Sequence, residues 1–277
     1  MGKFHRSTHQ KKYFTLANYF SYLLNINRLL VWKKLPGGEE YLSREEIKHL
    51  PLEKKGELLR DWIEENWKDS TVLGLSKAGL TYLPPEICQL SKLQELDLRE
   101  NQLTRLPAEI GQLSELQWLY LNQNQLTALP AEIEQLSELQ ELDLRENQLT
   151  RLPAEIGQLS ELQWLYLNQN HLTALPVEIG QLPKLQELDL RENQLTSLPA
   201  EIGQLPELQW LYLNQNQLTA LPVEIGQLFQ LEWLDLSQNQ LTRLPVEIGQ
   251  LSQLLILELA ENPLKDIAEK IRQRFQL

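Results

Sequence analysis

The chain has little cysteine, and its apolar residues are scattered. Its one cysteine, Cys88, excludes an internal disulfide. Extracellular repeat domains commonly staple their exposed ends with cysteines, so a reducing compartment is favoured and we expect a cytoplasmic protein. No apolar run reaches the roughly 18 residues that a membrane span requires. We therefore expect no membrane-spanning segment.

Side-chain arrangements that carry catalysis or bind metals are also missing. The sequence has no Gly-rich phosphate-binding loop and no pattern that pairs a nucleophile with a base. His5 and His9 have no cysteine or carboxylate cluster at metal-ligand spacing, and Cys88 has no nearby histidine to activate it. We expect no enzymatic activity, no cofactor and no metal site.

Charge is divided unevenly along the chain. Residues 1–38 contain seven Lys and Arg side chains and no Asp or Glu, so we expect a solvated, partly disordered basic arm there. Residues 1–69 carry 13 basic and 10 acidic side chains, a net charge of +3, and the remaining residues must carry −15 to give the total of −12. So acidic a region repels nucleic acid and anionic lipid and favours basic partners.

An internal repeat dominates the sequence. Residues 93–115 read LQELDLRENQLTRLPAEIGQLSE, and residues 116–138 read LQWLYLNQNQLTALPAEIEQLSE. A degenerate first unit begins near Ser70, and a truncated last unit begins at Leu254, so about nine units occupy residues 70–264. The intervening units of 23 residues begin at Leu139, Leu162, Leu185, Leu208 and Leu231.

A second period of 46 residues is superimposed on the first. The units that begin at residues 93, 139 and 185 carry ELDLREN, whereas those that begin at 116, 162 and 208 carry WLYLNQN. This alternation indicates tandem duplication of a pair of units. Duplication copies residues whether or not they are useful, so repetition alone does not establish a binding role.

Each unit predicts one turn of a solenoid. In residues 93–115, Glu95–Leu98 reads as a short strand whose leucines point inward. Asn101 falls where the chain turns, and its amide is expected to bond main-chain groups there. Pro107 ends the extended segment and predicts an extended or 3₁₀ return path. Because one turn cannot bury its own leucines, the units must stack, which predicts a parallel sheet on one face.

The segments LPxEIGQL and LxxLxLxxNxL resemble the 23-residue leucine-rich repeats of intracellular Ras-suppressor-type proteins and of many bacterial repeat proteins. The resemblance implies an α/β leucine-rich repeat solenoid, with a curved parallel sheet on the concave face and 3₁₀ or extended segments on the convex face. In function it implies binding of a partner protein. We expect a monomer with a helical N-terminal region (1–69), the repeat array (70–264) and a C-terminal cap helix (265–277).

Helices are predicted on both sides of the array. Ser43 and Glu46 form the S-x-x-E pattern of a capping box, and the following apolar stripe predicts a helix that ends near Asp69 and covers the first unit. After the array, residues 266–275 predict a cap helix because their apolar residues share one helical face. The two apolar sets are Leu58, Leu59, Trp62, Ile63 and Trp67, and then Ile267, Ala268, Ile271 and Phe275.

The segment LPGGEE at residues 35–40 and the helix after it resemble the helical cap of bacterial leucine-rich repeat effectors that are delivered into host cells. Some of these effectors are ubiquitin ligases whose catalytic cysteine follows the repeats, but residues 265–277 contain no cysteine. The resemblance implies an adaptor or a delivered effector. In that interpretation residues 1–69 dock to signalling or ubiquitin machinery, in the host cytosol for an effector, while the repeats select the target.

The candidate binding residues lie on the predicted concave face. Positions three, five, seven and eight of each unit are expected to face it, which gives aromatic rungs about 10 Å apart with charged rungs between them. The predicted partner-binding residues are Trp118, Tyr120, Trp164, Tyr166, Trp210, Tyr212, Trp233, Asp97, Asp143, Asp189 and Asp235.

This face has more than one interpretation. Trp and Tyr are enriched at binding hot spots, and carboxylates attract Lys and Arg, so the leading hypothesis is a non-enzymatic scaffold that binds a basic and apolar partner protein. Alternatively, Glu95, Asp97 and Arg99 pair with one another while the aromatic rings shield the sheet. A glycan stacked on the same rings is a further alternative.

Overall fold

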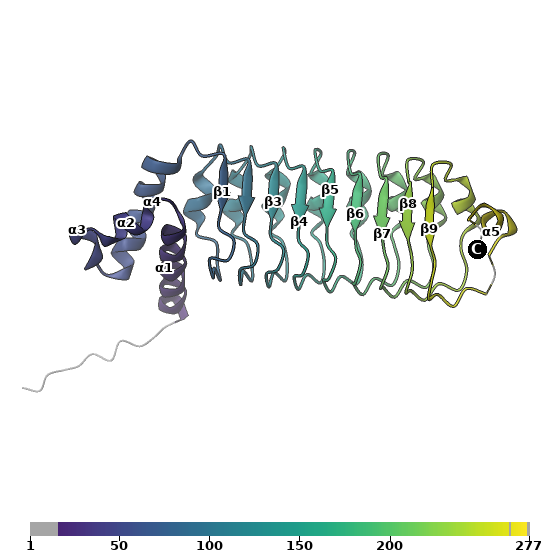
Figure 1. Cartoon of the computed structure of the whole chain (residues 1–277), viewed down its shortest axis with the longest axis horizontal. Helices are drawn as coiled ribbons and strands as arrows, with labels where there is room; N and C mark the ends of the chain where they lie inside the picture. The colour runs from purple at the N-terminus through teal and green to yellow at the C-terminus, as the bar shows by residue number, and fades with distance from the viewer. Residues whose placement is uncertain (1–15, 266, 276–277) are drawn as a thin grey trace, which may run out of the picture.

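The computed structural model describes residues 16–265 and 267–275. Within them, one parallel sheet of nine strands runs along the molecule, and each strand pairs with the next in sequence (Figure 1). Paired residues such as Val72 and Glu95, or Trp118 and Glu141, are one repeat apart, so every repeat adds one strand in the same register. The predicted solenoid is confirmed, and each unit is numbered below by its strand.

Each strand is three residues long. Its central leucine is buried, and the residues on either side of that leucine turn outward, as the period of two requires. The strands are β1 (Val72–Gly74), β2 (Glu95–Asp97), β3 (Trp118–Tyr120), β4 (Glu141–Asp143), β5 (Trp164–Tyr166), β6 (Glu187–Asp189), β7 (Trp210–Tyr212), β8 (Trp233–Asp235) and β9 (Ile256–Glu258).

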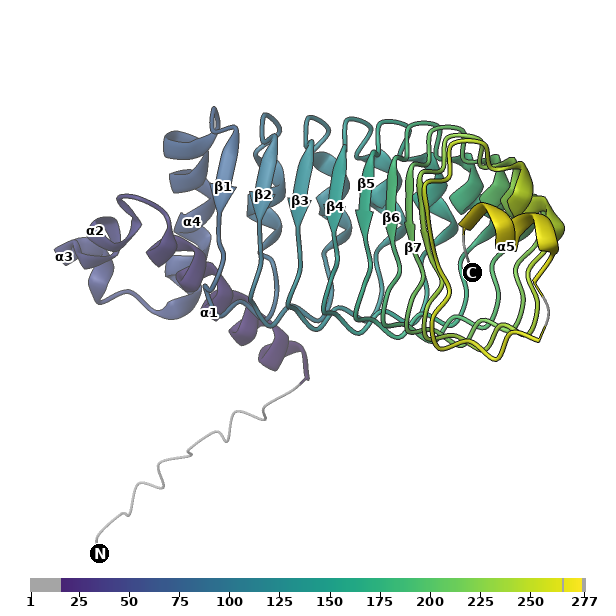
Figure 2. The same cartoon turned by 45° about the vertical axis from the view of Figure 1, so that its right-hand side comes forward.

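The chain returns through a 3₁₀ helix on the face opposite the strands (Figure 2). A proline stands before each such helix in extended conformation, for example Pro107 with φ −71° and ψ 152°. Its fixed φ and missing N–H end the extended segment there. The 3₁₀ helices are η1 (Pro85–Gln89), η2 (Ala108–Gln112), η3 (Ala131–Gln135), η4 (Ala154–Gln158), η5 (Val177–Gln181), η6 (Ala200–Gln204), η7 (Val223–Gln227) and η8 (Val246–Gln250).

A continuous core of leucine and isoleucine fills the space between the sheet and the 3₁₀ helices. One side of this core is closed by a ladder of buried asparagines. Asn147 shows the pattern: its Oδ1 accepts from the N–H of Leu126 at 3.0 Å, and its Nδ2 donates to the carbonyls of Leu121 and Leu144, each at 3.0 Å. The side chain thus satisfies main-chain groups of two consecutive units, as predicted for this position.

The N-terminal end of the sheet is covered by helices α1 (Leu16–Lys34), α2 (Gly38–Ser43), α3 (Glu45–Lys48) and α4 (Leu52–Trp67). The predicted apolar stripe of α4 packs on the core, with Leu59, Trp62 and Ile63 buried. Trp32 of α1 is fully buried and stacks on Tyr41 with ring centroids 5.0 Å apart. Figure 1 shows these helices at the β1 end.

Two N-terminal expectations require correction. The basic stretch was expected as a partly disordered arm, but from Leu16 it forms α1, whose Asn27 Oδ1 accepts from the N–H groups of Thr81 and Tyr82 in the first unit at 2.8 and 3.1 Å. Residues 1–15 of that stretch, with His5 and His9, lie outside the described residues. The capping box is also wrong: Ser43 ends α2, and its hydroxyl donates to the carbonyl of Glu40.

The C-terminal end of the sheet is covered by α5 (Glu269–Phe275). Ile271 is buried, and Ile267, Ala268 and Phe275 pack around it on the core, so the predicted apolar face is the one that docks. The Arg274 guanidinium donates to the carbonyl of Leu254 at 2.8 Å. The predicted helix begins at Glu269 rather than 266, and Asp266 lies outside the described residues.

Candidate functional site

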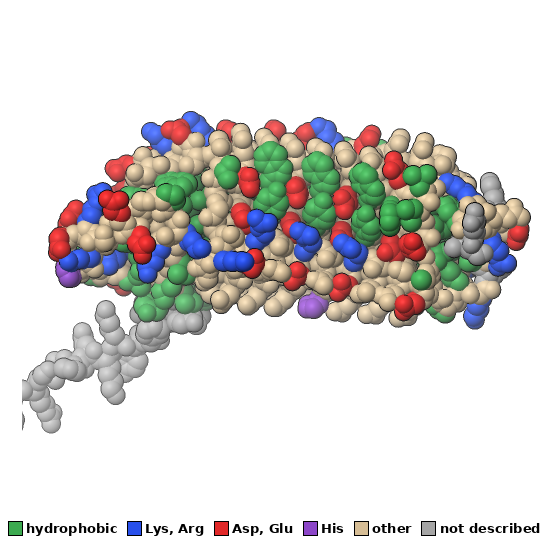
Figure 3. Space-filling model, in the orientation of Figure 1, with side chains coloured by type: hydrophobic (Ala, Val, Ile, Leu, Met, Phe, Trp, Pro, Cys, Tyr) green, Lys and Arg blue, Asp and Glu red, His purple; other side chains and the backbone are tan. Residues whose placement is uncertain are grey.

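The outward face of β2–β9, called the concave face below, carries all the predicted partner-binding residues. The first and third residues of its strands are mostly half-buried, whereas Asp143 and Asp189 are buried. Figure 3 shows hydrophobic side chains in separate bands over β3, β5 and β7, with acidic and basic side chains between them. The alternation seen in the sequence therefore becomes a striped surface.

The aspartates of β2, β4 and β6 are paired within the chain. Arg145, which follows β4, forms a bidentate contact with Asp143: its Nε donates to Oδ1 at 2.9 Å and its Nη2 donates to Oδ2 at 2.6 Å. Arg99 and Arg191 hold Asp97 and Asp189 in the same way. This is the internal pairing of Asp97 and Arg99 that the sequence left open. A basic partner at these rungs meets carboxylates that already have a guanidinium.

The same arginines extend to the aromatic rungs. The guanidinium carbons of Arg99, Arg145 and Arg191 lie 5.2–5.3 Å from the ring centres of Tyr120, Tyr166 and Tyr212, each in the next unit. Such cation–π contacts contribute about 0.5–1 kcal/mol at exposed sites. An Asp–Arg–Tyr chain thus links each acidic unit to the aromatic unit that follows it.

The tyrosine hydroxyls continue this chain into the following unit. Tyr120 donates to Glu141 Oε2 at 3.4 Å, and Tyr166 donates to Glu187 Oε2 at 3.3 Å. Burial and, second to it, the Glu141 carboxylate raise the pKa of Tyr120 to about 12. Burial also raises the pKa of Glu141 and Glu187, with the Asp143 and Asp189 carboxylates as further causes. Both glutamates therefore lose their charge at a higher pH than an exposed glutamate does.

The tryptophans are held less firmly than the tyrosines. Trp118, Trp164 and Trp210 remain half-exposed at the first position of their strands. Within the part of the face that the structure describes, the stacked or tilted ring pair is Tyr212 with Trp233, whose centroids are 6.1 Å apart. Half-buried indoles on a sheet give an apolar surface that a partner can cover.

The remaining candidate groups are the thiol of Cys88 and the metal-ligating side chains of the described residues. Cys88 is buried within η1, and burial together with the Glu109 carboxylate raises its pKa to about 12, so the thiol is unreactive. Over residues 16–265 and 267–275, no group of three or more His, Cys, Asp or Glu side chains is arranged to hold a metal ion. No helix in the same ranges combines the length and apolarity of a membrane span.

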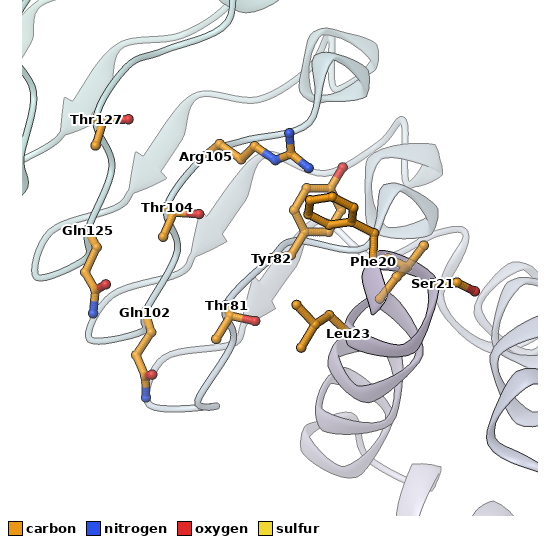
Figure 4. A pocket seen from close by; sticks show the side chains of 11 residues that line it. Phe20, Ser21, Leu23, Thr81, Tyr82, Gln102, Thr104, Arg105, Gln125 and Thr127 are labelled. Carbon is orange, nitrogen blue, oxygen red and sulfur yellow. The ribbon is translucent and has the colours of Figure 1, made fainter. Parts of the chain in front are cut away.

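A groove that the sequence does not predict lies between α1 and the first repeats. This groove, of about 830 Å³, is lined by Phe20, Leu23, Tyr82 and Arg105 and by threonine and glutamine side chains of the repeats (Figure 4). The Arg105 guanidinium carbon lies 5.9 Å from the Phe20 ring centre and 5.3 Å from that of Tyr82. The groove depends on α1, which was not predicted.

Comparison with known proteins identifies the class. Residues 71–126, 114–172 and 160–218 match the leucine-rich repeat family, and residues 200–273 match a leucine-rich repeat region. These matches cover most of the chain, so the protein belongs to the leucine-rich repeat proteins. No curated protein is significantly similar to it in sequence.

Three solved structures show the range of similar proteins. A leucine-rich repeat protein of Leptospira interrogans is 45% identical, covers 70% of this chain and 56% of its own, and has a TM-score of 0.56. The ectodomain of the Arabidopsis thaliana membrane receptor kinase GASSHO1/SCHENGEN3, in complex with CASPARIAN STRIP INTEGRITY FACTOR 2, is 34% identical over 72% of this chain and 25% of its own, with a TM-score of 0.66. The plant peptide hormone receptor RGFR1, in complex with RGF2, is 32% identical over 67% and 34%, with a TM-score of 0.53. The match thus spans little more than half of the bacterial protein and at most about a third of the receptors.

Proposed function

We propose that this protein is a non-enzymatic scaffold that binds a partner protein on its concave face and acts as a monomer in the cytoplasm. The observation that carries the proposal is the row of half-exposed indoles, Trp118, Trp164 and Trp210, fixed on a rigid sheet. A scaffold with ordered aromatic residues loses little side-chain entropy on binding, so most of the buried area contributes to affinity. The two plant receptors are solved in complex with CASPARIAN STRIP INTEGRITY FACTOR 2 and with RGF2, and this supports a binding role for the repeats here.

The chemistry of the face favours a basic and apolar partner. The outward residues at positions three, five and seven of β2–β9 comprise eight carboxylates and three arginines, a net charge of −5. The carboxylates are Glu95, Asp97, Glu141, Asp143, Glu187, Asp189, Asp235 and Glu258. Opposite charge steers a basic partner to the face, while contact with the indoles supplies the apolar part of the affinity.

Substitution of one aromatic rung tests the proposal. Trp164→Ala together with Tyr166→Ala is expected to weaken partner binding while far-UV circular dichroism and the melting temperature stay close to those of the wild type, because both side chains point away from the core. Val177→Ala with Val223→Ala on the 3₁₀ face is the matched control, since it removes exposed apolar area elsewhere. If the rung variant unfolds the array, the rings are structural and the proposal loses its basis.

An adaptor or delivered effector is the second candidate, with the N-terminal helices docking to signalling or ubiquitin machinery and the repeats selecting the target. Phe20, which lines the groove of Figure 4, and Tyr22, which is about half-exposed on the same helix, favour it. A deletion of α1 would also remove the buried Val31 and Trp32, so point variants are the cleaner test. Phe20→Ala with Tyr22→Ala is expected to abolish docking through this end and leave target binding intact. Unchanged partners and localisation would contradict the adaptor function.

A further inference from the structure

The unit that contains β8 breaks the alternation of the array. The charged units read Glu-Leu-Asp-Leu-Arg, as in residues 95–99, 141–145 and 187–191, whereas residues 233–237 read Trp-Leu-Asp-Leu-Ser. Position five is kept as Asp235, but the glutamate before it and the arginine after it are replaced by Trp233 and Ser237. Two consequences follow, one for apolar surface and one for charge.

The first consequence is that the apolar stripes merge at this end of the face. Trp118 lies between Glu95 and Glu141 in the register of the sheet, so its stripe is isolated. Trp233 instead pairs with Trp210 on one side and with Ile256 on the other. Leu255, the residue before β9, is 74% exposed. Three neighbouring strands thus form one apolar surface, of the kind that marks a binding site.

The second consequence is a pair of carboxylates, Asp235 and Glu258, that form no ion pair within the described residues. Asp235 Oδ1 accepts from the N–H and the hydroxyl of Ser237 at 2.9 and 2.7 Å, and no lysine or arginine of the described chain forms an ion pair with Asp235. Glu258, its partner in the sheet register, is exposed and followed by Ala260 at the position where the charged units have arginine. These two negative charges lie side by side next to the apolar surface.

In the other charged units an arginine of the same chain occupies the corresponding place. Its guanidinium contacts the aspartate through two nitrogens and lies over an aromatic ring, as that of Arg191 does between Asp189 and Tyr212. Around β8 the aspartate is kept, the ring of Trp233 stands beside it in the same strand, and the internal guanidinium is replaced by a serine. Arginine fits such a site better than lysine because its planar fork matches a carboxylate and stacks on a ring.

We propose that β7–β9 form the main anchor of the concave face, for a peptide segment of the partner that presents an arginine next to an aromatic or aliphatic side chain. The apolar side chain packs on Trp210, Trp233 and Ile256, and the guanidinium pairs with Asp235 and Glu258. This assignment rests on the proposed function, since it names where on that face binding is strongest and what chemistry the partner brings.

The test uses a variant that restores the pattern of the array. Trp233→Glu with Ser237→Arg gives this unit the Glu-Leu-Asp-Leu-Arg sequence of the other charged units, so the chain already shows that the fold accepts it. Trp118→Glu with Asn122→Arg is the matched control. It introduces the same two residue types in the unit of β3, and the net charge stays unchanged, as it does in the β8 variant. Far-UV circular dichroism and melting confirm the fold of both variants before binding is measured.

The probe is a phage-displayed library of random 12-residue peptides, selected on the full-length wild-type chain, with affinities measured by fluorescence polarisation on synthetic peptides. Selected peptides are expected to carry arginine beside an apolar residue. Their Kd is expected to rise about tenfold or more with Trp233→Glu/Ser237→Arg and about threefold or less with Trp118→Glu/Asn122→Arg. Replacement of the peptide arginine by citrulline, its neutral analogue, is expected to raise Kd by about tenfold as well.

Each other outcome separates this inference from the proposed function. Peptides that lose affinity for the β3 variant but not for the β8 variant overturn the anchor and leave the scaffold function standing. Peptides that lose affinity for the β8 variant but bind the wild type equally well when their arginine is replaced by citrulline overturn the arginine assignment. If no peptide is selected, or if the selected peptides bind both variants as tightly as the wild type, both the anchor and peptide binding by the concave face are contradicted.

Discussion

The asparagine ladder offers a stability prediction whose size follows from its hydrogen bonds. Asn147 is buried and bonds four main-chain groups: it accepts from Leu126 at 3.0 Å and donates to the carbonyls of Leu121 and Leu144 at 3.0 Å and of Arg145 at 3.2 Å. Asn147→Ala removes all four partners at once. Its partners come from two consecutive units, so the substitution removes a link between them.

The expected loss can be worked out from those groups. The Leu126 N–H is the group left unsatisfied inside the array, because the carbonyls of Leu121, Leu144 and Arg145 also accept from Asn124 Nδ2, Asn170 Nδ2 and the Gln123 N–H. An unsatisfied buried donor costs about 1–3 kcal/mol, and the loss of the second bond at each carbonyl adds to this cost. Asn147→Ala is therefore expected to lower the free energy of unfolding by about 2–4 kcal/mol. Gln148→Ala is the matched control: Gln148 is exposed, and its main-chain N–H still bonds Leu126.

Urea unfolding followed by far-UV circular dichroism measures the global effect. Repeat arrays also unfold locally, so hydrogen exchange at the Leu126 amide measures the effect at the site of the change. A destabilisation below about 1 kcal/mol, or one equal to that of Gln148→Ala, would refute the reasoning that the ladder holds consecutive units together.

Two further predictions concern titratable groups. Since the folded-state pKa of Glu141 and Glu187 is raised, the folded protein bears a penalty for their charge above that pKa, and this penalty disappears as the pH falls through it. Glu141→Gln with Glu187→Gln is therefore expected to raise the melting temperature at pH 7 by an amount that shrinks towards acid pH; an advantage independent of pH would contradict the assignment. The Cys88 thiol, with its pKa raised to about 12, is expected to react with a disulfide reagent at pH 8 only after urea unfolding, and rapid reaction of the native protein would show that the first repeat opens.

The periodic parts of the fold were predictable because every unit repeats the same local rule. Leucines at a period of two indicate the strands, Asn101 and its equivalents indicate the turn, and Pro107 indicates the 3₁₀ return. The backbone conformation of the residue before each ladder asparagine was not predicted. Glu100 and Glu146 both have φ of 53°, in the left-handed region, although neither is glycine. Stacking of units fixes that conformation, which local sequence disfavours.

Contacts between distant segments were less predictable. The docking of α1 depends on Asn27 meeting Thr81 and on Arg28 pairing with the buried Glu86, and both contacts join residues more than 50 positions apart. The concave residues were predicted as a set because alternation along a strand assigns the face. Their partners were not, since the Asp–Arg–Tyr chains depend on the exact register between neighbouring units. Arg145 and its equivalents were therefore not among the predicted site residues.

Above all, we propose that the aromatic rungs of the concave face bind a partner protein. Its most direct test is an affinity pull-down from cell lysate that compares the native protein with a folded Trp118→Ala/Trp164→Ala/Trp210→Ala variant. We expect a partner that the native protein retains and the triple variant loses. Retention of every partner by both proteins would contradict it, and the aromatic rungs would then be copies that duplication spread along the array.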